Sequence, residues 1–340
     1  EEVGLNGAKA LDKSVLKART MINMDSEDEG VATVSCAGGL RVQFTKEIQR
    51  TTVQGSLLTL KVEGLLGGHS GQDIDKERQN ADLLMARMIQ RLLKETKGQL
   101  VSFNGGTKDN AIPRECEASL IYESDEEAAK AEELACELAE TYAEELTPAE
   151  PDFSCEISCE TNRTAEAIPQ DAAKEFICAM RLAPNGIQKR NIKMDGFVVV
   201  SLNLGVVRTE EDRIVMIFSP RSSVASLQED TKERLNTLAE TFGFTVSHSS
   251  EYPGWSFKED SPVREICKES YKELFGEDLK IEAIHAGLEC GLFSDAIKGL
   301  DAIAIGPTIA NCHTPDEYLT LDSFERFYEF LKDILSRLAK

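Results

Sequence analysis

Apolar and polar residues recur with two different periodicities along this chain, and these periodicities distinguish predicted strands from predicted helices. Leu58, Leu60 and Val62 alternate with polar residues, which predicts a half-buried strand over residues 56–64. Residues 152–160 alternate in the same way, and 196–207 with 213–220 predict a hairpin across a polar turn. Residues 73–96 and the strongly acidic 125–146 instead place apolar side chains at helical spacing. The middle of the chain therefore predicts an α+β domain.

Both flanks of this middle part predict alternating strands and helices. The compact apolar runs 20–25 and 31–39 indicate strands, as do 279–284 and 301–305. Before the strand over 279–284, Ser261 and Pro262 predict the start of a helix that ends at Gly276. We therefore expect an α/β catalytic part over 1–40 and 246–340, interrupted by an inserted domain over 41–245. The apolar stripe of the final helix is expected in the core; it comprises Phe324, Phe327, Tyr328, Leu331, Ile334, Leu335 and Leu338.

Charge and cysteine content restrict the partners and the compartment. The 340 residues carry a net charge of −22, which argues against nucleic acid or an anionic membrane as partner. No apolar run reaches the length of a membrane span. The nine cysteines form no CxxC pair and mostly occupy apolar positions, a pattern typical of free thiols in a reducing cytoplasm.

Acidic residues and one histidine are candidate metal ligands. Thr314, Pro315 and Glu317 have the form of a capping box, which predicts a helix start directly after His313. A histidine fixed there could bind a metal, or could be an ordinary polar loop residue. Asp25 ends an apolar strand, where open α/β sheets place their chemistry, yet it also fits a solvated acidic turn. The pair Glu1-Glu2, on its own, predicts only an exposed acidic terminus.

Two further histidines lie in glycine-rich segments. In "GGHSGQD", glycines around His69 allow the backbone to approach a ligand closely. His285 and Glu289 are four residues apart, which on a helix would suggest a metal pair. Gly287 and Gly291 argue against a regular helix, so we expect a substrate loop there. The chain has no phosphate-loop ending and no G-x-S-x-G nucleophile motif.

Eight segments taken in order resemble the aminoacyl-histidine dipeptidases, cytoplasmic dizinc peptidases related to carnosinase and aminoacylase. They are "EEVGLNGA", "INMDSE", "GLLGGHSGQDI", "GGTKDNAIPRE", "SPRSS", "YPGW", "HAGLECG" and "IGPTIANCHTPDE". The resemblance extends from residue 1 to the final helix. It implies a zinc-exopeptidase-like α/β catalytic domain with an inserted lid and dimerisation domain.

The resemblance implies a role for each candidate residue. Glu1 matches the general base, while Glu2 and His313 match ligands of one metal ion and Asp25 a ligand of the other. His69 resembles the lid histidine that reaches into the partner subunit's site and stabilises the tetrahedral intermediate. The substrate-binding residues implied in this way are Asn110, Arg221, His285, Gly287 and Glu289.

The implied reaction is hydrolysis of Xaa-His or other dipeptides by a metal-activated water. Two divalent ions are expected as cofactors, zinc first, with manganese or cobalt as other options. The implied assembly is a homodimer formed through the lid domain, and the implied location is the cytoplasm.

The sequence departs from the family pattern in one respect. The family has a His-x-Asp and a bridging Asp upstream of the paired glutamates, and the sequence shown begins after them. On this ground we expect an incomplete parallel sheet and a chain that alone neither holds both ions nor is active, which a zinc titration would test. Two alternatives remain: a tripeptidase or aminoacylase of the same clan, and a non-catalytic dimerising or binding relative.

Overall fold

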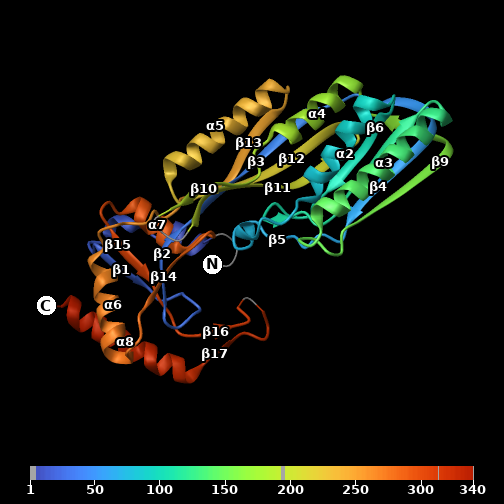
Figure 1. The fold of residues 1–340 in the computed structure, drawn as a ribbon. Coiled ribbons are helices and arrows are strands. Elements are labelled where there is room, and N and C mark those ends of the chain that lie inside the picture. The colour runs from blue at the N-terminus through green and yellow to red at the C-terminus, as the bar shows by residue number, and fades with distance from the viewer. Residues whose placement is uncertain (1–4, 193–195, 313, 340) are drawn as a thin grey trace.

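The computed structural model describes residues 5–192, 196–312 and 314–339, and these form two lobes (Figure 1). The larger lobe is built on one sheet in the order β13-β3-β12-β11-β6-β8-β4-β9, with β10 also paired to β11. Every pairing in its described part is antiparallel. Its strands are β3 (Gly38–Glu47), β4 (Thr51–Glu63), β6 (Gln99–Gly105), β8 (Cys116–Tyr122), β9 (Ser154–Ala167), β10 (Gly186–Asn191), β11 (Phe197–Thr209), β12 (Arg213–Ser222) and β13 (Thr245–Tyr252).

Helices cover one face of this sheet and close a single core against it (Figure 1). Leu58, Leu60 and Val62 of β4 are fully buried toward the helices, as their alternation predicts. The hairpin β11–β12 and the acidic helix are also confirmed. The helices are α2 (Ala81–Glu95), α3 (Asp125–Leu146), α4 (Gln170–Leu182) and α5 (Ala225–Thr241).

The helix predicted from residue 73 begins later than expected. A short 3-10 turn, η2 (Ile74–Lys76), comes first, and Glu77 then adopts a left-handed conformation with φ of 51° that ends it. Helix α2 begins only after Asn80, whose side chain accepts hydrogen bonds from the backbone N–H groups of Asp82 and Leu83. Residues 64–80 are consequently a long connection between β4 and α2. It contains the short strand β5 (Gly68–His69), which pairs with β7 (Ala111–Ile112).

The smaller lobe contains a four-stranded sheet in the order β1-β15-β2-β14. Within the described residues, β1 runs parallel to β15 and β14 parallel to β2, but β15 meets β2 antiparallel at Ala304 and Thr33. The expected incomplete parallel sheet is therefore parallel only within each pair of strands, because the two pairs run in opposite directions. The strands are β1 (Thr20–Asn23), β2 (Val31–Cys36), β14 (Lys280–Ile284) and β15 (Asp301–Ala304).

Successive residues at the end of β15 point to opposite faces of this sheet, and each face is covered. Ile303 and Ile305 belong to the core formed with α6 and α8, whereas Ala302 and Ala304 pack with Cys290 of α7. Helix α6 has the predicted Ser261 cap and a left-handed Gly276 at its end. The helices and short segments of this lobe are α1 (Asn6–Ala10), η1 (Lys13–Val15), α6 (Pro262–Phe275), α7 (Glu289–Ala296), β16 (Ile309–Ala310), β17 (Tyr318–Leu319) and α8 (Leu321–Leu338).

Two predictions about the end of the chain are wrong. Residues 314–317 form a turn and not a helix start: Thr314 Oγ1 donates to Asn311 O and accepts from Asp316 N, and the chain then forms β17. Helix α8 begins at Leu321. Its predicted apolar stripe is only partly core, because Phe327 and Ile334 are buried, whereas Phe324, Tyr328, Leu335 and Leu338 are exposed.

The large sheet extends beyond the expected limits of the inserted domain, since β3 begins at Gly38 and β13 ends at Tyr252. None of the described helices combines the length and apolar character needed to cross a membrane.

Candidate functional site

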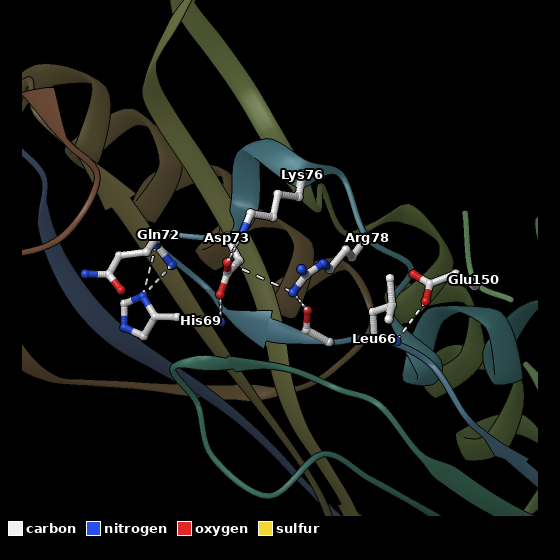
Figure 2. Close-up of polar contacts among 9 residues, drawn as sticks. Leu66, His69, Gln72, Asp73, Lys76, Arg78 and Glu150 are labelled. Carbon is white, nitrogen blue, oxygen red and sulfur yellow. Dashed lines mark hydrogen bonds and ion pairs between the residues drawn. The ribbon is translucent and has the colours of Figure 1, made fainter. Parts of the chain in front are cut away.

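His69 lies in the loop between β4 and α2, where several backbone groups hold it (Figure 2). Its Nδ1 atom accepts hydrogen bonds from Gly71 N at 3.2 Å and from Gln72 N at 3.0 Å. Its own backbone N–H donates to Asp73 Oδ2 at 2.7 Å. Gly68 has a φ of 138° and Gly71 packs against the carbonyl of His285, so side chains at either position would clash.

These contacts determine the chemical form of the His69 imidazole. Because Nδ1 accepts two N–H groups, the proton of the neutral ring resides on Nε2. Burial, followed by the positive charge of Arg221, lowers the pKa of His69 below its ordinary value of 6.5. At neutral pH His69 is therefore a neutral donor through Nε2–H.

Arg221 is a buried cation near this histidine. It lies toward the end of β12 with 7% of its surface exposed, and its Nη1 donates to the Tyr252 hydroxyl at 2.9 Å. Its buried Nε has no hydrogen-bond partner among the residues that the structure describes. A buried guanidinium with a free donor is a strong site for an anion, because a carboxylate would satisfy both its charge and its N–H groups.

His285 connects the two lobes. It follows β14 in the smaller lobe, and its Nε2 lies 2.7 Å from Ser201 Oγ on β11 of the larger lobe. Burial, followed by the charge of Arg221, lowers the pKa of His285 to about 3, so its ring is neutral at physiological pH. Its loop is fixed further by Ala37 N, which donates to the carbonyls of Ile284 and Ala286.

A cleft of about 800 Å³ opens between the His69 loop, β10–β11 and β14, and of the three residues His69, Arg221 and His285, His285 lines it. Its described lining includes polar and aromatic side chains from both lobes. They include Gln72, Asp75, Arg190, Phe197, Phe257 and His285. The volume is sufficient for a small peptide.

The structure does not bring Asp25 to the lining of this cleft. Asp25 is exposed two residues beyond β1, with its N–H donating to Asn23 Oδ1 at 2.8 Å. The neighbouring loop lies beside the segment that leads to residue 313, because Ile309 N donates to Glu27 O at 2.9 Å. The carboxylate of Asp25 is a suitable ligand for a divalent ion, and the two segments proposed to carry ligands are adjacent.

Three predicted residues of the metal site, Glu1, Glu2 and His313, lie outside the described residues. Within the described ranges no group of three or more His, Cys, Asp or Glu side chains is arranged to hold a metal ion. The ligand set therefore remains a prediction.

Of the remaining predicted substrate residues, Asn110 and Gly287 lie near the cluster of His69, Arg221 and His285. Asn110 is exposed, and its carbonyl accepts a hydrogen bond from Ser70 N next to His69. Gly287 packs closely against the Tyr252 ring. Glu289 is the first residue of α7, so it shares no helix with His285, as expected. Gly291, in contrast, lies within α7 and not in the expected loop.

Comparison with known proteins identifies the family of this chain. The model of peptidase family M20/M25/M40 matches residues 1–337. The chain belongs to this peptidase family. It is 33% identical to the cytosol non-specific dipeptidase of Escherichia coli (strain K12), over 99% of this chain and 70% of that protein. The structure resembles that of aminoacylhistidine dipeptidase from Vibrio alginolyticus, with a TM-score of 0.94, 34% identity, and coverage of 99% of this chain and 69% of that one.

Family membership confirms the resemblance on which the sequence prediction depended, and with it the α/β fold and the assignment as a peptidase. Tyr252 and Ser201 were missed as site residues. The only sequence signal for Tyr252 is its place in the "YPGW" segment, and Ser201 occupies an ordinary position in an apolar strand. Ser201 reaches His285 only where the two lobes meet, whereas Tyr252 and Arg221 come together from β13 and β12 of the larger sheet.

Proposed function

We propose that this protein hydrolyses dipeptides, of Xaa-His type or of broad specificity, with the help of bound divalent metal ions. The observation that carries the proposal is Arg221, a buried cation with a free donor beside two histidines that are neutral at physiological pH. This arrangement suits the free carboxylate of a short peptide. The names of the two relatives, both dipeptidases, support the same substrate class.

The proposed roles divide the reaction among this chain's residues. Arg221 would bind the peptide's terminal carboxylate through a planar pair of N–H groups. The Nε2–H of His69 would donate to the scissile carbonyl oxygen as negative charge develops on it. Glu1 would accept the proton of the attacking water and then donate it to the leaving amine. His285 would line the cleft around the substrate, and Asn110, Gly287 and Glu289 would contribute further substrate contacts.

Glu2, Asp25 and His313 would hold the metal ions. Zinc bound there supplies a water with a pKa lowered toward about 7 and polarises the carbonyl. Carboxylate and imidazole ligands also accept manganese or cobalt.

We further propose that the larger lobe is a lid and that the protein forms a homodimer through it. We also propose that the protein is located in the cytoplasm. Its terminal strands β9 and β13 leave one edge each without a partner strand in the described sheet, and such edges can pair between subunits. Light scattering on the purified protein tests this, with twice the monomer mass expected.

The experiment that tests the function uses the complete natural protein, stripped of metal and then supplied with zinc. Release of histidine from an Xaa-His dipeptide should require the metal, and the dipeptide with an amidated C-terminus should be a poor substrate. Equal cleavage of both peptides would contradict the role given to Arg221. Preferential cleavage of tripeptides or N-acyl amino acids would favour the tripeptidase or aminoacylase alternative.

A further inference from the structure

Glu150 is a buried carboxylate just after α3, and both of its oxygens bind the backbone of the His69 loop. It is only 2% exposed. Oε2 accepts from Leu66 N at 2.7 Å (Figure 2), and Oε1 accepts from Gln79 N at 2.8 Å. Leu66 and Gln79 lie near the start and the end of the loop between β4, which ends at Glu63, and α2, which begins at Ala81. One side chain therefore ties together the two ends of the segment that carries His69.

The contacts inside the loop continue from these two ends to the imidazole. Arg78, next to Gln79, donates from Nη1 to Gly67 O at 2.5 Å. Asp73 accepts from Lys76 at 2.5 Å through Oδ1 and from His69 N at 2.7 Å through Oδ2. Figure 2 shows these side chains in a row between Glu150 and His69. The position of the imidazole thus depends on a loop whose ends are held by Glu150.

We propose that Glu150 is a positioning residue for His69. By binding Leu66 N and Gln79 N together, it keeps the loop in the form in which Gly71 N and Gln72 N reach His69 Nδ1 and leave the proton on Nε2. The proposal rests on the catalytic role proposed above for His69. Glu150 itself touches neither substrate nor metal in this account.

The chemistry of the side chain explains why a carboxylate is needed. Both of its oxygens are acceptors, whereas the amide of glutamine has one acceptor and one donor. Glu150→Gln keeps the size and shape but sets an NH2 group against one of two backbone N–H groups. One end of the loop is then released with little change in packing.

Glu145 provides a matched control. It lies five residues earlier, near the end of α3, and its exposed carboxylate pairs with Arg87 and not with the loop. Glu145→Gln removes a charge from the same part of the chain without touching residues 66–79.

The test combines nitrogen NMR of ¹⁵N-histidine-labelled protein with steady-state kinetics of the zinc-loaded complete protein. We expect the His69 signals of wild type to show an accepting Nδ1 and a protonated Nε2. In Glu150→Gln this pattern should shift toward a mixture of tautomers, and kcat should fall on the order of 10- to 100-fold with KM little changed. Glu145→Gln should match wild type in both measurements.

Three results would overturn the proposal. The first is a Glu150→Gln protein with the wild-type His69 spectrum and the wild-type kcat. The second is an equal loss in Glu145→Gln. The third applies even if Glu150→Gln fails to fold: in the wild type, the amides of Leu66 and Gln79 should exchange as slowly as those of β4, and rapid exchange would show that no clamp exists.

The two readouts also separate this proposal from the function on which it rests. If the wild type cleaves no dipeptide, the proposed function fails, while the His69 spectrum still decides the role of Glu150. If a His69 substitution abolishes turnover but Glu150→Gln does not affect it, the function stands and the positioning role is wrong.

Discussion

Arg221 Nη1 donates a hydrogen bond to the hydroxyl oxygen of Tyr252 over 2.9 Å, and this contact orients a buried guanidinium that has no described anionic partner. Tyr252 is the last residue of β13, and its ring packs against Gly39 and Gly287. The tyrosine thus connects the proposed carboxylate site to the loop after β14.

Arg221→Met should weaken binding of peptides with a free C-terminus. Loss of charge-assisted hydrogen bonds is worth about 1.5–3 kcal/mol, so KM should rise roughly 10- to 100-fold. Peptides with an amidated C-terminus should show little change, because they offer no carboxylate. Arg213→Met is the control, since Arg213 lies on the same strand but is exposed and pairs with Glu210. Equal effects on both substrates would refute the carboxylate role.

Tyr252→Phe should have a smaller effect of the same kind. It removes the acceptor of one hydrogen bond from the charged guanidinium of Arg221 and leaves both the guanidinium and the ring packing in place, so we expect a loss of about 1 kcal/mol. We expect a rise in KM of about fivefold and an almost unchanged melting temperature. A large drop in kcat at constant KM would mean that Tyr252 acts directly on the reaction.

The comparison between sequence and structure shows which features are local. Ser261, Pro262 and Gly276 define α6 correctly, because capping and helix termination depend on neighbouring residues alone. Thr314 forms a turn in place of a capping box, since pairing of β17 with β16 extends the chain just after it. The direction of β15 relative to β2 likewise depends on distant partners.

In the site, too, the sequence predicts local features but not contacts between distant segments. The glycines around His69 could be read from the sequence because backbone freedom is local. The contact of Ser201 with His285 joins residues 84 positions apart on different lobes, and no pattern in either segment indicates it. Glu150 stands in a polar turn where its burial could not be foreseen.

The low pKa of His285 predicts a dependence of stability on pH. The folded protein holds this ring neutral down to about pH 3, whereas the unfolded chain takes up the proton near 6.5. Between these values the unfolded state binds more protons, so stability falls as the pH is lowered, by up to about 1.4 kcal/mol per pH unit. Denaturant unfolding between pH 4 and 7 should show a shallower slope in His285→Gln. His248→Gln, in an exposed position, should keep the wild-type slope.

Asp82 predicts the opposite trend. Burial raises the pKa of Asp82 to about 8, only partly offset by the Cys116 thiol and Arg208. The folded state therefore binds the extra proton between about 3.8 and 8, and stability falls as the pH rises through this range. Asp82→Asn should remove this loss and raise the free energy of unfolding at pH 8. Asp171→Asn, in the exposed first turn of α4, is the control; a wild-type pH profile in Asp82→Asn would contradict the account.

The measurement that tests the proposed site most directly is the turnover of His69→Leu, which removes the Nε2–H donor, in the zinc-loaded complete protein. Loss of a donor to developing negative charge typically lowers kcat by about 10²- to 10³-fold. We expect a loss of this size, with the zinc content and the melting temperature of the wild type retained. A kcat equal to that of the wild type, or a loss explained by missing zinc, would contradict the role of His69 as the neutral donor of this site.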